Sequence, residues 1–268
     1  EVSQWSFVDE SGAPALRRES VRSAGFPISS MAVSSAGLIA LGSLEGRIRG
    51  FDSARGKWTI QTQMGVRTVT SLCFDSTGKR LASGDGRGGV STLVLASGQN
   101  SSGAAASFTD LALVSSGPAL TYFAGSDAGE VWLGIAESTH EPTPIRVARR
   151  SLTGVAASSD GAYLATSSYA RSVLVRSHEL KSLLTMEGVA NRIPQDVSFA
   201  GPNRLAGAVG DEVLVWDLPA TAVQQTLKAQ GAITALEGDA SEGRIAIATK
   251  AGVQVWDRAG KEIARLPV

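Results

Sequence analysis

Residues that could take part in catalysis are few in this chain and lie far apart in its sequence. Two histidines, His140 and His178, lie in polar stretches, and the only cysteine, Cys73, lies in an apolar run where we expect it to be buried. Nucleophilic catalysis needs a nucleophile beside a base that a third group orients, and no motif of this kind is present. A zinc site needs three or four ligands, and nothing places a third ligand near the two histidines. We therefore expect no metal site and no cofactor.

Carboxylates are the remaining candidates for catalysis. Asp110, Asp196 and Glu237 lie in short apolar segments, and a pair of carboxylates could hydrolyse a glycosidic bond. The interpretation that we favour is that these side chains accept hydrogen bonds from nearby backbone amides. Residues 84–89 (GDGRGG) resemble a phosphate-binding loop, but the Gly-Lys-Ser/Thr ending is missing, so we expect a tight turn. The sequence thus predicts a protein that is not an enzyme.

Composition and charge exclude several other classes. The chain has 268 residues, with 25 basic and 25 acidic side chains, and this balance argues against nucleic acid as a partner. No apolar run approaches the roughly 18 residues of a membrane-spanning helix. A single cysteine allows no internal disulfide, which favours a cytoplasmic or other intracellular location. The chain begins at Glu1 and not at a methionine, so we expect a preceding segment.

A short apolar segment followed by a turn recurs six times along the chain. These repeats would position the candidate catalytic residues named above. The segments are residues 28–33, 69–74, 108–113, 152–157, 194–199 and 233–238, and successive starts are 41, 39, 44, 42 and 39 residues apart. In each repeat, further short alternating segments follow, separated by turns rich in Gly, Asp and Ser, which indicates strands and not helices. A period of about 40–45 residues with four strands per repeat is typical of β-propeller blades.

The repeats predict an all-β fold: one β-propeller domain over residues 1–268, made of four-stranded antiparallel blades. The predicted blades are residues 28–68, 69–107, 108–151, 152–193, 194–232 and 233–268, and residues 1–27 form a half blade. In this half blade, residues 5–9 resemble a third strand and residues 15–21 a fourth. We expect seven blades, with the inner strands of the first one preceding Glu1. The alternative is six blades or an open ring, in which a partner chain covers the unpaired strand edge.

Two dipeptides connect the repeats to a known family. Trp216-Asp217 and Trp256-Asp257 match the Trp-Asp pair that ends the third strand of a WD-repeat blade, and Phe51-Asp52 is a softened copy. The chain therefore resembles the WD-repeat β-propeller family over nearly its whole length, with divergent repeats, because no Gly-His dipeptide precedes a first strand. We interpret the Trp-Asp pairs as packing and turn elements.

The resemblance implies a function. It implies a non-enzymatic scaffold that binds other proteins within a multiprotein complex. One alternative is a structural coat or core subunit that a partner strand completes, as in the open propellers of vesicle-coat and nuclear-pore complexes. The other is a propeller that binds a small ligand, or hydrolyses a substrate, in its central channel.

The resemblance also indicates a binding face. In this family the loops from fourth to first strand and from second to third strand share the top face, and here they carry nine basic and five acidic residues. Arg binds carboxylates and phosphates in bidentate fashion, so we expect acidic or phosphorylated protein segments as partners. The alternative is that these charges serve solubility alone. Phe26 and Ile193 lie beside this face as apolar anchors or as wedges between blades. The residues expected to bind partners are Arg67, Arg150, Arg192, Arg22 and Lys228.

Overall fold

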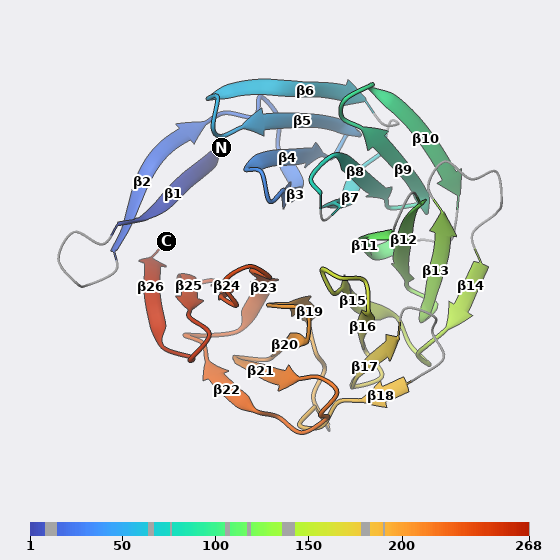
Figure 1. Ribbon diagram of the computed structural model, residues 1–268, viewed down its shortest axis with the longest axis vertical. Coiled ribbons are helices and arrows are strands. Elements are labelled where there is room, and N and C mark those ends of the chain that lie inside the picture. Colours follow the sequence, from blue (N-terminus) through green and yellow to red (C-terminus); the bar gives the residue numbers. More distant parts are fainter. Residues whose placement is uncertain are drawn as a thin grey trace. The chain divides into compact units, whose positions relative to one another are not determined.

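The computed structural model confirms the predicted fold class. It describes residues 1–8, 15–63, 67–75, 77–104, 108–116, 119–135, 143–177, 183–189 and 191–267 (Figure 1). The regular secondary structure of these residues consists of strands. The 26 strands form six four-stranded antiparallel sheets and one two-stranded sheet. Each four-stranded sheet is made of consecutive strands in chain order, which is the topology of a β-propeller blade. Six complete blades and a two-stranded sheet fit both blade counts that the sequence allows.

The chain divides into two compact units, which we describe separately: a middle unit, Ala24–Leu152, and a terminal unit, Glu1–Ser23 with Thr153–Val268. The middle unit holds three blades. Their strands are β3 (Ile28–Val33), β4 (Leu38–Ser43), β5 (Arg47–Asp52) and β6 (Lys57–Gln63) in blade one; β7 (Val69–Phe74), β8 (Arg80–Asp85), β9 (Gly89–Val94) and β10 (Gln99–Ala104) in blade two; and β11 (Phe108–Ser116), β12 (Ala119–Ser126), β13 (Glu130–Ile135) and β14 (Thr143–Arg146) in blade three.

The terminal unit holds the other three blades and the two-stranded sheet. Its strands are β15 (Leu152–Ala157), β16 (Tyr163–Ser168), β17 (Ser172–Ser177) and β18 (Leu183–Thr185) in blade four; β19 (Asp196–Phe199), β20 (Arg204–Val209), β21 (Glu212–Asp217) and β22 (Gln225–Lys228) in blade five; and β23 (Ile233–Gly238), β24 (Ile245–Thr249), β25 (Gly252–Trp256) and β26 (Glu262–Pro267) in blade six.

The predicted third and fourth strands near the start of the chain are also present. They are β1 (Val2–Val8) and β2 (Ala15–Arg22), which pair with each other in antiparallel fashion. Among the described strands, β1 pairs with β2 alone, and β2 contacts β26 of the same unit. The edge of β1 that faces away from β2 thus has no strand partner in the described part of the chain.

The turn between first and second strand explains why the repeat begins as it does. The side-chain oxygens of Ser34, Asp75 and Ser158, which occupy equivalent places in three repeats, accept hydrogen bonds from the backbone amides that start the next strand, at 2.9–3.1 Å. Three residues after each of them stands a glycine with φ between 67° and 78°. Short polar side chains and a glycine in the left-handed region are what such a tight turn requires.

Apolar packing between neighbouring blades forms the core of each unit. Leu72 on β7 lies in one cluster with Ala40 and Ile48 of blade one. Leu236 on β23 lies in the same way with Ala206 and Val213 of blade five. Blades two and six thus each bury a first-strand side chain against the second and third strands of the blade before them, which removes apolar surface from water.

Hydrogen bonds one repeat apart add to this packing. The Ser29 hydroxyl donates to the Val69 carbonyl at 2.8 Å, and the Thr153 hydroxyl donates to the Pro194 carbonyl at 2.7 Å. These bonds join the first strand of one blade to the start of the next. Such hydrogen bonds stabilise the fold most where water is excluded, because a buried polar group without a partner destabilises it.

The glycine-rich segment and the two Trp-Asp pairs all lie within or at the ends of blade strands. Residues 84–89 join β8 to β9, and the Asp85 carboxylate accepts hydrogen bonds from the amides of Arg87 and Gly89, so this segment is a turn, as predicted. Trp216 is fully buried and donates from Nε1 to the Glu187 carbonyl at 3.2 Å. The Asp257 carboxylate accepts from the Lys261 amide at 2.9 Å. The Trp-Asp pairs therefore serve packing and turns.

Candidate protein-binding surfaces

The five basic residues predicted to bind partners are divided between the two units. Arg67 and Arg150 belong to the middle unit, and Arg22, Arg192 and Lys228 belong to the terminal unit. Arg192 is partly buried and the other four are exposed. Of the five, the structure brings Arg192 and Lys228 together around shared carboxylates.

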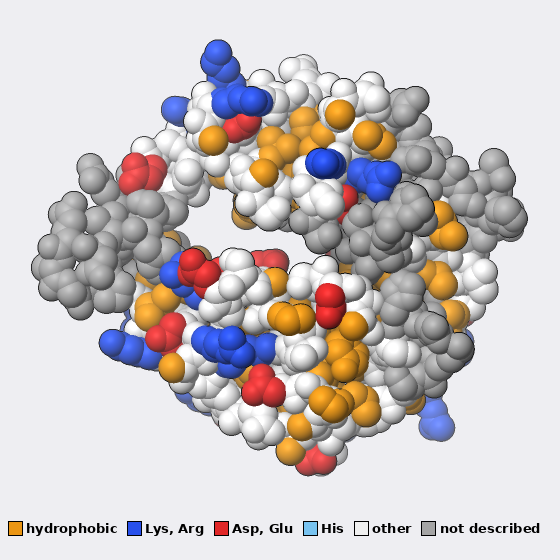
Figure 2. All heavy atoms as spheres, in the orientation of Figure 1, with side chains coloured by type: hydrophobic (Ala, Val, Ile, Leu, Met, Phe, Trp, Pro, Cys, Tyr) orange, Lys and Arg blue, Asp and Glu red, His pale blue; other side chains and the backbone are white. Residues whose placement is uncertain are grey.

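A charge cluster forms on blade five from Arg192, Asp211, Glu212 and Lys228, which we call the blade-five charge cluster. The Arg192 guanidinium binds Glu212 at 2.5 Å and donates a second hydrogen bond to the Gly188 carbonyl at 2.8 Å. The Lys228 ammonium lies 2.9 Å from the Asp211 carboxylate and 3.5 Å from that of Glu212. Two cations and two anions cancel, so this part of the predicted face is neutral. Figure 2 shows basic side chains beside acidic ones over blades five and six.

The ion pairs also shift the titration of their members. The hydrogen bond from Lys228 lowers the pKa of Asp211, and the one from Arg192 lowers the pKa of Glu212. The hydrogen bond to Asp211 in turn raises the pKa of Lys228. An acidic ligand would have to displace these carboxylates, whose charged forms the cluster already stabilises.

The other three predicted residues lie outside this cluster. The Arg67 guanidinium lies 3.9 Å from the Asp85 carboxylate, which also holds the β8–β9 turn. Arg150 has no hydrogen bond or ion pair from its side chain to any described residue. Arg22 is exposed at the end of β2. Ile193, expected beside these residues, is 40% exposed, which suits an apolar anchor.

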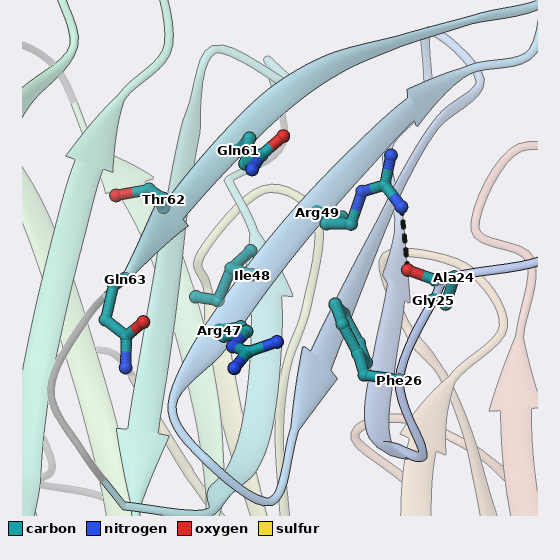
Figure 3. Close-up of a pocket in the computed structure, with 9 residues that line it drawn as sticks. All are labelled: Ala24, Gly25, Phe26, Arg47, Ile48, Arg49, Gln61, Thr62 and Gln63. Carbon is teal, nitrogen blue, oxygen red and sulfur yellow. Dashed lines mark hydrogen bonds between the residues drawn. The ribbon is translucent and has the colours of Figure 1, made fainter.

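A cavity of about 520 Å³ lies on blade one, and the sequence did not indicate it (Figure 3). Residues 24–26, 47–49 and 61–63 line it, from the segment before β3 and from the neighbouring strands β5 and β6. Phe26, predicted as an anchor or a wedge, is one of them. In Figure 3, Arg49 points toward Ala24, and its Nη1 donates a hydrogen bond to the Ala24 carbonyl at 2.7 Å. The volume lies within the range of ligand pockets, roughly 300–1,000 Å³.

Arg49 is the distinctive charge of this cavity. Its guanidinium stacks on the Trp58 ring, 4.1 Å from the ring centroid, and no described carboxylate forms an ion pair with it. Its Nε is buried without a hydrogen-bond partner among the described residues. The neighbouring Arg47 forms an exposed ion pair with Glu45 at 2.9 Å. The cavity thus holds one uncompensated cation and one loosely paired cation, and this favours an anionic group.

A signal for this cavity is present in the sequence. The third strand of blade one reads RIRGFD, with arginines on either side of its buried Ile48. The residues equivalent to Arg49 in the other five third strands are uncharged: Ser91, Trp132, Leu174, Leu214 and Gln254. A comparison of the repeats position by position would therefore have singled out Arg49.

The residues considered for catalysis have structural partners where they are described. The Asp110 carboxylate accepts hydrogen bonds from the Leu111 amide at 2.8 Å and from the Ser71 hydroxyl at 3.2 Å. Asp196 accepts from the Val197 amide at 2.8 Å. Glu237 is exposed on β23. His140 and His178 lie outside the described residues.

Cys73 was expected to be buried, and it is partly buried. It packs against the cluster of Ala82 and Leu111 between blades two and three. Burial raises the pKa of its thiol well above the ordinary value, and the charges of Asp110 and Asp75 raise it further. Such a thiol is a poor nucleophile at neutral pH.

The described residues show neither a cluster of metal ligands nor a membrane-spanning helix. No group of three His, Cys, Asp or Glu side chains in this part of the chain could hold a metal ion. The described residues also include no helix with the length and apolar character needed to cross a membrane.

Comparison with known proteins supports the fold and gives no family. No model of a protein family matches the chain, and no curated protein sequence matches it. Among solved structures, it is similar to a chain in the crystal structure of a mitotic checkpoint complex, with a TM-score of 0.76 and 18% sequence identity. The match covers 92% of this chain and 81% of the other. At this level of identity the two chains share a fold, and the fold of the present chain is the β-propeller.

Proposed function

We propose that the protein is a divergent WD-repeat β-propeller that acts as a non-enzymatic scaffold for protein–protein interactions within a multiprotein complex. The observation that carries this proposal is the similarity, over 92% of the chain, to a chain found in a complex of proteins. The Trp-Asp pairs at the ends of β21 and β25 support the WD-repeat assignment, because the family places them there. Trp216 and Trp256 are buried, so we propose that they serve packing and not binding.

Within this proposal, Arg150 and Arg67 are the strongest of the five predicted contacts. Arg150 has no described partner, and the Arg67–Asp85 pair is long, so both guanidinium groups can bind a carboxylate or phosphate without first losing a strong ion pair. Arg192 and Lys228 already hold Glu212 and Asp211. We propose acidic or phosphorylated protein segments as the partners of these loops.

Affinity purification of the tagged protein from its native cells, followed by mass spectrometry, tests the scaffold. Stoichiometric protein partners are expected, and they are lost in a variant that carries Arg67→Glu and Arg150→Glu. Arg258→Glu is the matched control, since Arg258 is an exposed arginine in the β25–β26 turn. Partners retained in both variants would place the interface elsewhere. A monomer without any partner would contradict the scaffold.

The open edge of β1 favours a second candidate: a structural subunit whose two-stranded sheet a partner strand completes. Among the described strands β1 pairs with β2 alone, and edge strands of this length are normally covered. Hydrogen exchange separates the two candidates. A purified partner that slows exchange of the β1 amides, and that binds regardless of Arg67 and Arg150, supports the second candidate. Unchanged exchange in β1 contradicts it.

A further inference from the structure

One position on the first strands distinguishes blade one from all other blades. The fourth residue of each repeat's first segment is apolar, and in five blades it is 3–7% exposed. In blade one this residue is Met31, which is 56% exposed, and its neighbour on the same side of the strand, Val33, is 59% exposed. The five buried residues are Leu72, Leu111, Val155, Val197 and Leu236.

The partners of the buried residues show what Met31 lacks. Leu72 packs on Ala40 of a second strand and Ile48 of a third strand, and Val197 packs on Ala165 and Val173 in the same way. A small side chain beside a β-branched one, both from extended segments, is the surface that covers this position. Met31 and Val33 are exposed and lack such a cover, whereas Leu41, the next residue of the same cross-strand row, is fully buried.

The strand register puts this apolar face and the cavity on one side of blade one. Met31 pairs with Leu41, Leu41 with Arg49, and Arg49 with Gln61. Residues that are directly opposite in antiparallel strands point to the same face of the sheet. Two interstrand spacings of about 4.8 Å place Arg49 roughly 10 Å from Met31. We call Met31, Val33, Arg47, Arg49 and Gln61 the blade-one face.

The charges of this face determine what can bind there. Arg49 is held in place by the Ala24 carbonyl and the Trp58 ring, and no described carboxylate neutralises it. Arg47 has only an exposed ion pair, and exposed ion pairs are weak. Gln61 is exposed, and its amide adds a donor. A carboxylate is therefore complementary to this end of the face, and an apolar or small side chain to the other end.

We infer that the blade-one face binds an extended acidic segment of a partner protein. An Asp or Glu side chain of the segment enters the cavity beside Arg47 and Arg49, and a small or β-branched residue covers Met31 and Val33. A spacing of roughly 10 Å corresponds to about three residues of extended chain, so we expect a motif in which an acidic and an apolar residue stand about three positions apart. The inference rests on the proposed function only in taking the occupant to be a protein.

Selection from a library of random peptides of about 12 residues, displayed on phage and captured by the whole 268-residue chain, tests the inference. We expect enriched peptides to carry Asp or Glu near an apolar residue. Fluorescence anisotropy then measures the Kd of the most enriched peptide. Arg47→Glu and Met31→Glu should each weaken binding at least about ten-fold, because each places a negative charge against an acidic ligand.

Both substitutions are at exposed side chains, so we expect them to leave the fold intact, and an unchanged urea midpoint verifies this. Arg146→Glu is the matched control, since Arg146 is an exposed arginine of the same unit on β14, and its Kd should equal that of the unchanged protein. Enriched peptides without carboxylates, or peptides that bind both variants as tightly as the control, would overturn the inference.

The two proposals fail in different ways. If cellular partners persist in a double variant with Arg47→Glu and Met31→Glu, the scaffold proposal is supported. The same result contradicts the proposal that these partners bind the blade-one face through an acidic segment. Peptides that bind this face, together with a protein that recovers no partner from cells, support the face and contradict the scaffold.

Discussion

Blade one and blade five share one strand topology but differ along one row of side chains. In blade five the row that starts at the first strand is apolar and closed: Val197 and Leu214 are each 3% exposed. In blade one the equivalent row starts at the exposed Met31 and reaches the charged Arg49 on the third strand. The difference shows that a blade's topology does not require this row to be apolar. In blade one only the middle of the row, Leu41, is fully buried, while Met31 at the first strand is exposed and Arg49 at the third strand is charged.

Exchanging the third-strand residues of this row is expected to have the largest effect. Leu214→Arg should lower the free energy of unfolding by about 3–5 kcal/mol, because it places a guanidinium without a partner among Val175, Met186 and Trp216. The reciprocal Arg49→Leu should lower it by a smaller amount, about 1–2 kcal/mol, because it removes only the hydrogen bond to the Ala24 carbonyl and the contact with Trp58. Urea denaturation followed by tryptophan fluorescence measures both. Equal losses would mean that the two rows are equally covered, which would contradict the comparison.

Thiol chemistry gives an intermediate effect and compares two first strands directly. A Met31→Cys variant has two thiols, one at position 31 in blade one and Cys73 in blade two. The first should react with a disulfide reagent near pH 8 more than about ten-fold faster, because it is exposed, whereas burial raises the pKa of Cys73. The reaction followed by absorbance should show two phases. A single phase would show that position 31 is covered in solution. Met31→Ser, which has Cys73 alone, supplies the slow reference.

The smallest effect concerns the blade-five charge cluster. Arg192→Gln should raise the pKa of Glu212 toward its ordinary value of 4.5, because the hydrogen bond from Arg192 is the main cause of its lowering. A carboxyl pKa that is lower in the folded than in the unfolded chain stabilises the fold above the ordinary pKa, and this stability is lost as pH falls through the lowered folded value. The stability difference between the two proteins should therefore shrink in acid.

An NMR titration of the Glu212 carboxyl carbon measures the shift, with Arg258→Gln as the control. Salt should reduce the difference between variant and unchanged protein, because the cluster is exposed to solvent. A Glu212 pKa that does not move in Arg192→Gln would show that the ion pair is absent in solution.

Much of the fold could be predicted from the sequence because each blade repeats a local pattern. The first strands expected at 28–33, 69–74, 152–157 and 233–238 have the bounds of β3, β7, β15 and β23. Such bounds are local properties: an alternating apolar segment, then Ser or Asp, then a glycine at the turn. Where the pattern weakens, as at residues 194–199, the strand is shorter, Asp196–Phe199, because Pro194 cannot donate to a ladder hydrogen bond.

The candidate sites were harder to predict because they depend on register and pairing between segments. The sequence indicated Arg192, Lys228, Asp211 and Glu212 as loop charges, but not that they neutralise one another. In the same way, nothing local links Arg49 to Met31, which is 18 residues away in sequence yet lies in the same cross-strand row. A net charge counted over loops cannot distinguish a free arginine from a paired one.

The hydrogen bonds from Ser29 to Val69 and from Thr153 to Pro194 have a consequence for how the protein folds. Each spans 40 or 41 residues, which is one repeat, so the bonds that join blades connect nearest neighbours along the chain. A chain built in this way behaves like a row of coupled units, whose stability is a sum of unit and neighbour contributions. Its unfolding need not be all-or-none. Native-state hydrogen exchange should reveal blades that open one after another, with free energies that rise toward the blades that have the most buried neighbours.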